Sequence, residues 1–514
     1  MAVEPKGPGV VSSAGAALGN SPIPLNRSIV AAFIGRTERG PLNEPVGIDS
    51  FSQFRRTFGG HCDYSLLSHA LLHFFMQGGE RALVVRVANR ATRARIEIPT
   101  DGPALILQAR RPGSHELLRA SVDYDGVENL PSCFNLVVQQ LLDGDSQQIQ
   151  DQELFPALSV DPANRRFVVD VLKESQLVRP AGPVPATRPL ATRASHPGQP
   201  IPYIEMTSPG SDGDELTDYD IIGSNSEGTG LFALDRAEPF DLLCIPPAPH
   251  VELGVTTFVA AERYCERRRA LLIWDPPWSW SSAADAVAAA RRFGRLSRNA
   301  MTYFPRIRRR GDGVRFPAGL PACGALAGAL ARDGAAGIWR LPQRVAALSA
   351  AFTTVGDVDV RTRSVLRRCG VNTLAVTDGR VTLHGDVTLA GSSAASSIWR
   401  SLHCRRLAFF VLSSIAEATT WVSERIDSPQ VPAALEKQVR TFLRGLFDYG
   451  ALAGQAAQHA FTVRAVSSEE PAVLLKVGFA LRKSGELTGY EFRYTRAGVA
   501  LSYAAGLEAE QLVG

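Results

Sequence analysis

The chain has little of what marks a disulfide framework or a zinc-binding fold. Its 514 residues include only seven cysteines, which are scattered and form no C-x-x-C pair. Disulfide frameworks and zinc knuckles need clustered or regularly spaced thiols. The cysteines therefore predict reduced, mostly buried thiols in a cytosolic setting, with no disulfides and no bound metal.

Long hydrophobic runs are also missing. The apolar stretch ADAVAAA ends at Arg291 and Arg292, well short of the about 18 residues that a membrane-spanning helix needs. The N-terminus, MAVEPKGPGVVSSAG, has no basic region followed by an apolar core, so it predicts no secretion signal. We expect a protein that folds in the cytoplasm, stays soluble and does not insert into membranes.

The sequence also lacks a strong excess of charge of either sign. The formal net charge is +4 over the whole chain, and this small value argues against a general nucleic-acid binder. Hydrophobic residues make up 45% and charged residues 21%, as in ordinary globular proteins. The chain can therefore bury a sizeable core without disulfides or metals.

Motifs that would indicate an enzyme are weak. GTGLFA, at residues 228–233, matches the G-x-G-x-x-A dinucleotide pattern, but it follows the polar turn SNSE, and Pro239 prevents a long helix after it; we interpret it as a turn. IWDPP resembles an apolar strand that ends in a metal-binding Asp, but no G-x-x-x-x-G-K-[ST] loop occurs for such a residue to serve, so Asp275 is interpreted as a residue of a strand-end turn. No G-x-S-x-G elbow of a hydrolase occurs either. We expect no catalytic residues and no cofactor.

His69 and His73 would share one face of a helix, as zinc ligands do. They lack the intervening Glu of an H-E-x-x-H motif, and the helix is otherwise rich in Leu and Phe. Buried or boundary histidines are therefore predicted. Gly324, Gly328 and Gly334 have small-xxx-small spacing, which, without an apolar membrane span, indicates tight packing or a loop.

An α/β pattern follows a polar N-terminal arm. Residues 1–27 are rich in Gly, Pro, Ser and Asn and have no periodicity, so they predict an extended arm. SIVAAFIG and ALVVRV then predict buried strands on either side of a helix in SLLSHALLHFFM, which Gly78 and Gly79 end. A strand–helix–strand order is typical of an α/β layer.

The pattern changes near Asn89 and changes back near residue 204. Short β-like runs such as RARIEIP, ALILQAR and RFVVDVL predict an inserted, mainly-β domain, and seven prolines between 179 and 202 predict a loop or linker at its end. FDLLCIPP and RALLIWDPP then predict buried strands, and PAALEKQVRTFLRGLF predicts a helix. HAFTVRAV, VLLKVGFAL and YEFRYT predict the last strands.

Several strings, in their order along the chain, resemble the contractile phage tail sheath family. They include VAAFIGRTERGPLNEPV, FRRTFGG, HFFMQGGERALVVRV, GTGLFALDRAEPFDLLCIPP, YCERRRALLIWDPP, GALAGALARDGAAGIWRLP and HCRRLAFFVLSSI. The resemblance covers the chain from about Gly7 to Tyr494. The tail from Arg496 to Gly514 runs beyond the family's usual final strand.

The resemblance implies a structural protein of a phage tail, a tailocin or a related contractile injection system, and not an enzyme. It implies hexameric rings that stack helically around an inner tube and contract to drive the tube through a target envelope. The implied partners are other copies of the chain, the inner tail tube protein, and baseplate and tail terminator proteins. The alternatives are a baseplate or other tail structural protein of the same machine, and an α/β hydrolase or nucleotide-binding enzyme.

The expected fold class is α/β (α+β) and multidomain, with a discontinuous mixed-sheet core that the N- and C-terminal parts form around the inserted domain. The predicted parts are an N-terminal extended arm (1–27), the first part of the α/β core (28–88), the inserted mainly-β domain with its proline-rich linker (89–204), a central α/β sheath domain (205–395), a C-terminal tube-proximal domain (396–480), and a C-terminal strand and arm (481–514).

Two sets of residues are predicted to serve assembly. In the helix after Pro432, the residues Leu435, Val439, Phe442, Leu443 and Leu446 recur at helical spacing and should face the core. Lys437, Arg440 and Arg444 then form a basic stripe, which is either a solvated face or, as the resemblance implies, faces acidic side chains of the tube.

The two arms are predicted to exchange strands between subunits, because an extended segment can add to a neighbour's sheet edge through backbone hydrogen bonds. Disordered termini on a monomer are the alternative reading. The residues proposed for the exchange are Val10, Val11, Tyr490, Phe492 and Tyr494.

Overall fold

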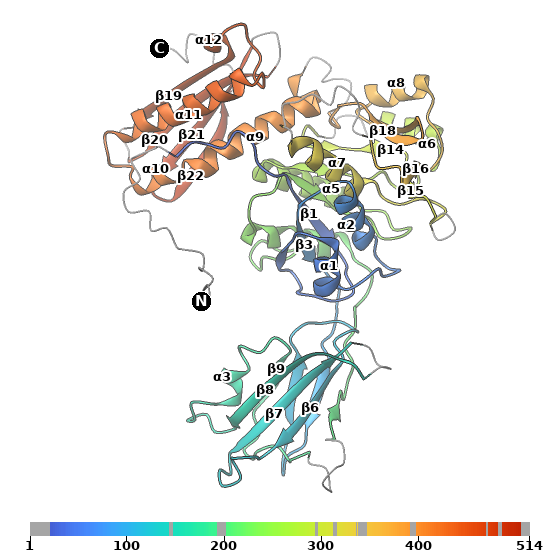
Figure 1. Cartoon of the computed structure of the whole chain (residues 1–514), viewed down its shortest axis with the longest axis vertical. Coiled ribbons are helices and arrows are strands. Elements are labelled where there is room, and N and C mark those ends of the chain that lie inside the picture. The colour runs from blue at the N-terminus through green and yellow to red at the C-terminus, as the bar shows by residue number, and fades with distance from the viewer. Residues whose placement is uncertain are drawn as a thin grey trace, which may run out of the picture.

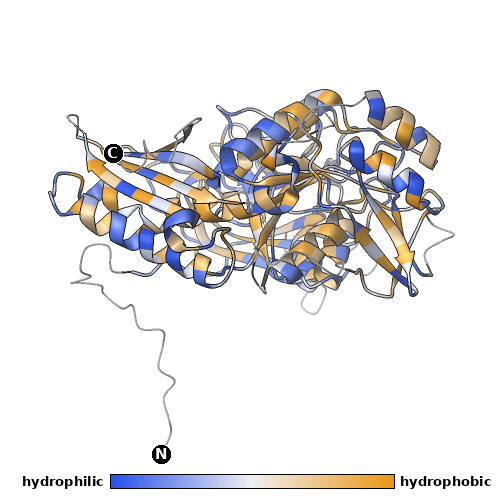
Figure 2. Ribbon diagram, turned by 90° about the horizontal axis from the view of Figure 1, so that it is seen from above, coloured by the Kyte–Doolittle hydropathy of each residue, from blue (hydrophilic) through white to orange (hydrophobic). Residues whose placement is uncertain are grey.

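The computed structural model describes residues 21–504 except for the segments 143–146, 193–201, 293–296, 312–315, 336, 338–346, 391–396, 469–470 and 482–485. Figure 1 shows three parts: a central body, an inserted β domain that projects from one end of the body, and a C-terminal unit beside the other end. The α/β class predicted from the sequence is confirmed. In Figure 2 the strands are predominantly hydrophobic, whereas the helices alternate hydrophobic and hydrophilic faces.

A six-stranded sheet forms the centre of the body, in the order β13-β12-β11-β1-β3-β2. Five of its strands are parallel and β2 is antiparallel to β3. The strands are β1 (Val30–Gly35), β2 (Pro45–Ile48), β3 (Arg81–Arg86), β11 (Leu242–Cys244), β12 (Leu271–Ile273) and β13 (Ala300–Met301). The sheet therefore joins strands from before and after the inserted domain.

Helices cover both faces of this sheet, which is why its central strands are apolar throughout. Ala31 and Phe33 of β1 belong to the core cluster on one face, and Ala32 and Ile34 to the cluster on the other. The first face carries α1 (Phe51–Phe58), α2 (Leu67–Met76) and α7 (Cys323–Ala335). The second carries α4 (Asp218–Ile222), the 3-10 helix η1 (Gly230–Arg236) and α5 (Val255–Arg268).

The α2 and α7 helices approach each other closely because α7 presents glycines. A Cβ atom on Gly324 would overlap the carbonyl oxygen of Ala70, and one on Gly328 would overlap that of Phe74. At the end of α7, a Cβ atom on Gly334 would overlap the side chain of Ile29. Of the two alternatives predicted for these three glycines, tight packing or a loop, the structure shows tight packing within a helix.

The rest of the body is built from short strands and helices beyond β13. They are β14 (Tyr303–Phe304), β15 (Ile307–Arg309), β16 (Phe352–Thr354), β17 (Asn372–Thr377), β18 (Arg380–His384), α6 (Ala283–Arg292), α8 (Val360–Arg368) and the 3-10 helix η3 (Ile398–Arg400). Trp280 and Leu366 belong to a small separate core that joins α6 to α8.

The inserted domain has two antiparallel sheets and a core of its own. Its elements are β4 (Arg95–Ile98), β5 (Leu105–Ala109), β6 (Leu118–Asp123), β7 (Cys133–Leu141), β8 (Ile149–Ser159), α3 (Val168–Val171), β9 (Val178–Pro180) and β10 (Ile204–Glu205). The two segments that connect this domain to the body run antiparallel, with a β-bridge between Asn89 and Asp214. Hydrogen bonds hold Leu190 and Thr192, from the proline-rich segment, against this domain.

The C-terminal unit is a four-stranded antiparallel sheet with helices beside it. Its elements are α9 (Leu402–Ala418), α10 (Trp421–Glu424), α11 (Val431–Asp448), α12 (Ala457–Ala460), β19 (Phe461–Ser467), β20 (Val473–Ala480), β21 (Leu487–Thr495) and β22 (Gly498–Ala504). The strands pair in chain order.

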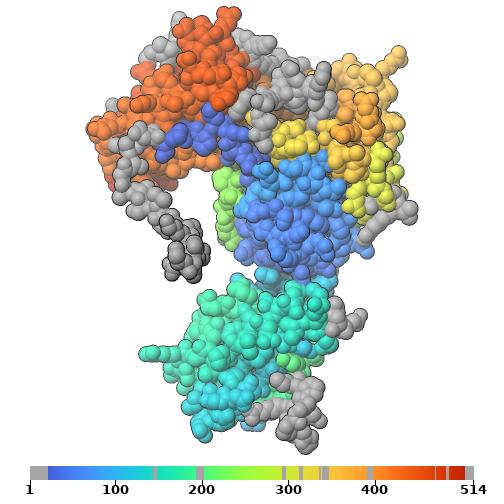
Figure 3. All heavy atoms as spheres, viewed as in Figure 1, coloured from blue at the N-terminus to red at the C-terminus, as the bar shows by residue number. Residues whose placement is uncertain are grey.

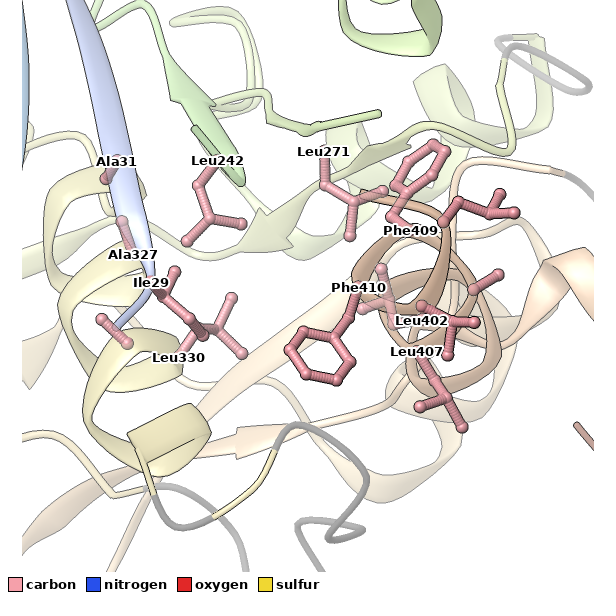
Figure 4. Close-up of a cluster of buried hydrophobic side chains, with 14 of the residues drawn as sticks. Ile29, Ala31, Leu242, Leu271, Ala327, Leu330, Leu402, Leu407, Phe409 and Phe410 are labelled. Carbon is pink, nitrogen blue, oxygen red and sulfur yellow. The ribbon is translucent and has the colours of Figure 1, made fainter. Parts of the chain in front are cut away.

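The α9 helix joins this unit to the body. Its Leu402, Leu407, Phe409 and Phe410 lie in the same core cluster as residues of β1, β11, β12 and α7 (Figure 4). Figure 3 shows the segment after residue 20 running across the C-terminal unit before it enters the body.

Candidate assembly surfaces

The amphipathic helix α11 carries the predicted basic stripe. Pro432 stands in its first turn, where a missing backbone N–H costs no hydrogen bond. The prediction for its apolar face is confirmed: Leu435, Val439, Phe442, Leu443 and Leu446 are all buried.

The stripe of Lys437, Arg440 and Arg444 is exposed on the other face of α11. Arg440 lies 2.7 Å from Glu436 and also donates to the carbonyl oxygen of Val463. Arg444 lies 3.0 Å from Asp448. Two of the three charges thus have carboxylate partners on their own helix. Within the described part of the chain, Lys437 has no ion-pair partner.

Tyr490, Phe492 and Tyr494 lie in β21, which pairs with β20 on one edge and with β22 on the other. All three side chains are buried, and the Tyr494 hydroxyl lies 2.8 Å from that of Thr419. In the single chain these residues are core residues of an interior strand and present no free strand edge. Their exchange between subunits stays a prediction.

The outer strands of this sheet are β19 and β22. No strand of the described chain pairs with the outer edge of either, so both leave backbone groups for another segment. The residues after the predicted final strand thus form a further strand, β22. The edge of the sheet on this side is therefore β22, and not β21, which holds the residues named for exchange.

The base of the N-terminal arm lies against the C-terminal unit. The Gln438 side chain of α11 donates to the carbonyl oxygen of Ser21, and Ile23 is buried. Arg27 forms ion pairs with Asp241 and Glu417 at 2.7 and 2.9 Å. Val10 and Val11, the other residues predicted to exchange, lie outside the described residues.

A charged network, which the sequence did not reveal, joins the inserted domain to the body. Arg86, at the end of β3, is fully buried and donates to the carbonyl oxygens of Gly40 and Pro112. It lies 3.7 Å from Asp212, which accepts hydrogen bonds from Ser114 and Tyr64. An arginine at the end of an apolar strand, ALVVR, was the one available signal.

The features considered as enzyme motifs have structural roles. Gly230 of GTGLFA takes a positive φ of 59° and donates its backbone N–H to Asn43, and a Cβ atom there would come within 2.6 Å of the Ile221 carbonyl oxygen. His69 and His73 are buried beside aromatic rings, as predicted. No cluster of His, Cys, Asp or Glu suited to a metal ion occurs in the described residues.

Asp275 has a more specific role than the predicted strand-end turn. Its carboxylate accepts the backbone N–H groups of Ala322 and Cys323 at 2.7 and 3.1 Å, and so it holds the N-terminus of α7 against the end of β12. Burial raises the pKa of this carboxyl to about 6, although the two N–H groups oppose the rise.

Among the described residues, no helix is long and apolar enough to cross a membrane.

No protein-family model matches the sequence, and neither does any curated protein. The fold, however, is that of sheath tail proteins. A sheath tail protein from Listeria innocua matches with a TM-score of 0.63 and 12% identity, covering 93% of this chain and 97% of that one. One from Desulfitobacterium hafniense matches with a TM-score of 0.52 and 13% identity, covering 94% and 100%.

A third structure is the sheath complex of an extracellular contractile injection system, PVC, in the contracted state. It matches with a TM-score of 0.50 and 12% identity, covering 99% of this chain and 96% of that one. The resemblance to contractile sheath proteins inferred from the sequence is therefore confirmed at the level of the fold.

Proposed function

We propose that this chain is the structural subunit of a contractile tail sheath, which assembles as stacked hexameric rings around an inner tube and contracts to drive that tube through a cell envelope. The observation that carries the proposal is the extent of the fold similarity: three sheath structures match along at least 93% of this chain. A protein that shared one module with a sheath would match over that module alone. The proposed role is structural, without catalysis.

The proposed partners are other copies of the chain, the tube protein, and baseplate and tail terminator proteins. The exposed face of α11 is the surface proposed for the tube. Because Arg440 and Arg444 already have carboxylate partners, Lys437 would carry most of the free charge. The pairs would each contribute about 0.2–1 kcal/mol, repeated in every subunit.

The arms are proposed to link the subunits. In this proposal the segment before Ser21 would extend away from its own subunit and add to a sheet edge of a neighbouring subunit, because strand addition needs only a free edge and an extended segment. The outer edges of β19 and β22 meet that need within the described chain.

The test is negative-stain electron microscopy of the purified chain with and without its tube protein. Long striated cylinders are expected for a sheath. Discrete particles under every condition would contradict the proposal and favour a baseplate component or an enzyme.

A further inference from the structure

A cavity of about 270 Å³ opens beside the carboxyl ends of β1 and β11. Among the residues that the structure describes, four carboxylates and one cationic side chain, that of Arg36, line it. The guanidinium of Arg36 donates to the carbonyl oxygens of Asp212 and Gly213 and lies 4.3 Å from the ring centroid of Tyr64. With four carboxylates against this one guanidinium, the mouth keeps an excess of negative charge. The carboxylates belong to Asp63, Glu215, Asp218 and Glu252.

Exposed apolar side chains stand beside this acidic mouth. Tyr219, next to Asp218 in α4, is 82% exposed, and Val255, at the start of α5, is 67% exposed. Val259 follows Val255 by one helical turn and is also exposed, so the two valines share a face of α5. Apolar groups beside a charged mouth are typical of a protein–protein contact.

The α8 helix has the complementary character. Its sequence, VRTRSVLRR, contains four arginines and no acidic residue, and Val360 is 69% exposed. Arg367 has an ion-pair partner in Asp386. Arg361 and Arg368 have none within the described residues. Figure 1 shows α8 at the end of the body far from the inserted domain, whereas the acidic mouth lies beside the chain crossing to that domain.

We propose that α8 of one copy docks on the acidic mouth of the next copy, with arginines facing carboxylates and Val360 facing the rim of Tyr219 and Val255. The proposal rests on the proposed function, because it names a subunit contact of that polymer. The two surfaces differ and lie at different ends of the body. When two copies dock, one copy still has a free α8 and the other still has a free acidic mouth. Such a heterologous contact propagates, and opposite charges fix its register.

Charge exchange tests this contact in the full-length chain. The variants are E215R/E252R in the mouth and R361E/R368E on α8, with R95E/R165E in the inserted domain as a control whose charge change equals that of the α8 variant. All these side chains are exposed, so the variants should fold, and circular dichroism and thermal unfolding check this. The measurement is the fraction of protein pelleted as cylinders with the tube protein.

Each reversed pair should lower the pelleted fraction at least tenfold, and the chain carrying both pairs should recover to within about twofold of wild type, because the charges again match. Normal cylinders from either single reversal, or no recovery in the combined chain, would overturn the contact.

A wild-type chain without cylinders would count against the proposed function, and sedimentation velocity of the chains alone then decides the contact. Salt-sensitive association that the single reversals weaken tenfold would support it. A wild-type chain that stays monomeric would overturn it.

Discussion

Glu38 Oε1 lies 3.0 Å from His115 Nε2, and this ion pair joins the body to the inserted domain. The hydrogen bond with His115 and one from the Gly60 backbone hold the pKa of Glu38 down at about 2, despite partial burial. The same contact raises the pKa of His115. Asp212 and Arg39 are the other charged groups that face His115.

The stability of this junction should therefore depend on pH. The Glu38 contribution is present above the ordinary carboxyl pKa and is lost as the pH falls towards 2. The His115 contribution is present below the ordinary imidazole pKa and is lost as the pH rises through the raised value. The pair should stabilise most at about pH 5–6.

His115→Ala should consequently cost about 1 kcal/mol of stability at pH 5.5, a modest loss because the pair is partly exposed. The loss should be smaller at pH 8.5, because the charge of His115 is lost as the pH rises. Thermal unfolding at both pH values measures this, and Glu44→Gln, at an exposed carboxylate of the same loop region, is the control. An equal loss at both pH values would show that packing and not charge holds the junction.

Gly324→Ala should destabilise the body, because the added Cβ atom would overlap the carbonyl oxygen of Ala70 and force α2 and α7 apart. We expect a loss of about 1–3 kcal/mol, typical of overpacking. Gly102→Ala is the matched control, since its Cβ atom would meet nothing closer than 3.9 Å. Urea unfolding of both variants gives the comparison, and equal midpoints would mean that the helices can separate at no cost.

Asp275→Ala should cost about 1–3 kcal/mol, because two buried backbone N–H groups at the start of α7 would lose their acceptor. Asp275→Asn keeps an acceptor oxygen without the charge. Burial raises the pKa of Asp275, so wild-type stability should increase as the pH falls from about 6 towards the ordinary carboxyl value, and the Asn variant should lack that increase. Chemical unfolding at pH 5 and pH 8 tests both expectations.

Lys437→Glu should weaken assembly on the tube more than Arg440→Glu or Arg444→Glu does. Each arginine already has a carboxylate partner on α11, whereas Lys437 has none in the described chain. Arg425→Glu, an exposed reversal on the neighbouring segment, is the control. The measurement is the yield of extended particles at low and high salt. Unchanged yield and salt dependence for Lys437→Glu would mean that the stripe is only solvated.

Removal of residues 1–20 should leave a folded chain that forms no cylinders, because the base of the arm from Ser21 onwards, including buried Ile23, still packs on the C-terminal unit. Removal of β21 is a different experiment: Phe492 and Tyr494 are fully buried, so its loss should unfold that unit. Circular dichroism separates the two cases, and electron microscopy reads out assembly. Normal cylinders from the shortened chain would contradict a linking role for the arm.

The sequence by itself determined the local elements, because their signals are local. The apolar runs VAAFIG and ALVVR predicted buried strands, and the spacing from Leu435 to Leu446 predicted that one side of α11 faces the core. The ordered strings from about Gly7 to Tyr494 that resemble tail sheath proteins predicted the fold class, and a solved sheath tail protein matches the fold over 93% of the chain.

Long-range relationships needed the tertiary structure, because periodicity along the chain does not say which surfaces meet. YEFRYT reads as a strand whether it is an edge or an interior strand, and only the pairing with β22 decides that it lies inside the sheet. Asp275 and Cys323, Arg86 and Asp212, and Glu38 and His115 are each brought together by the path of the chain around the parallel sheet. The charges of α8 and of the acidic mouth are visible in the sequence, but only the fold places them on different ends of the body.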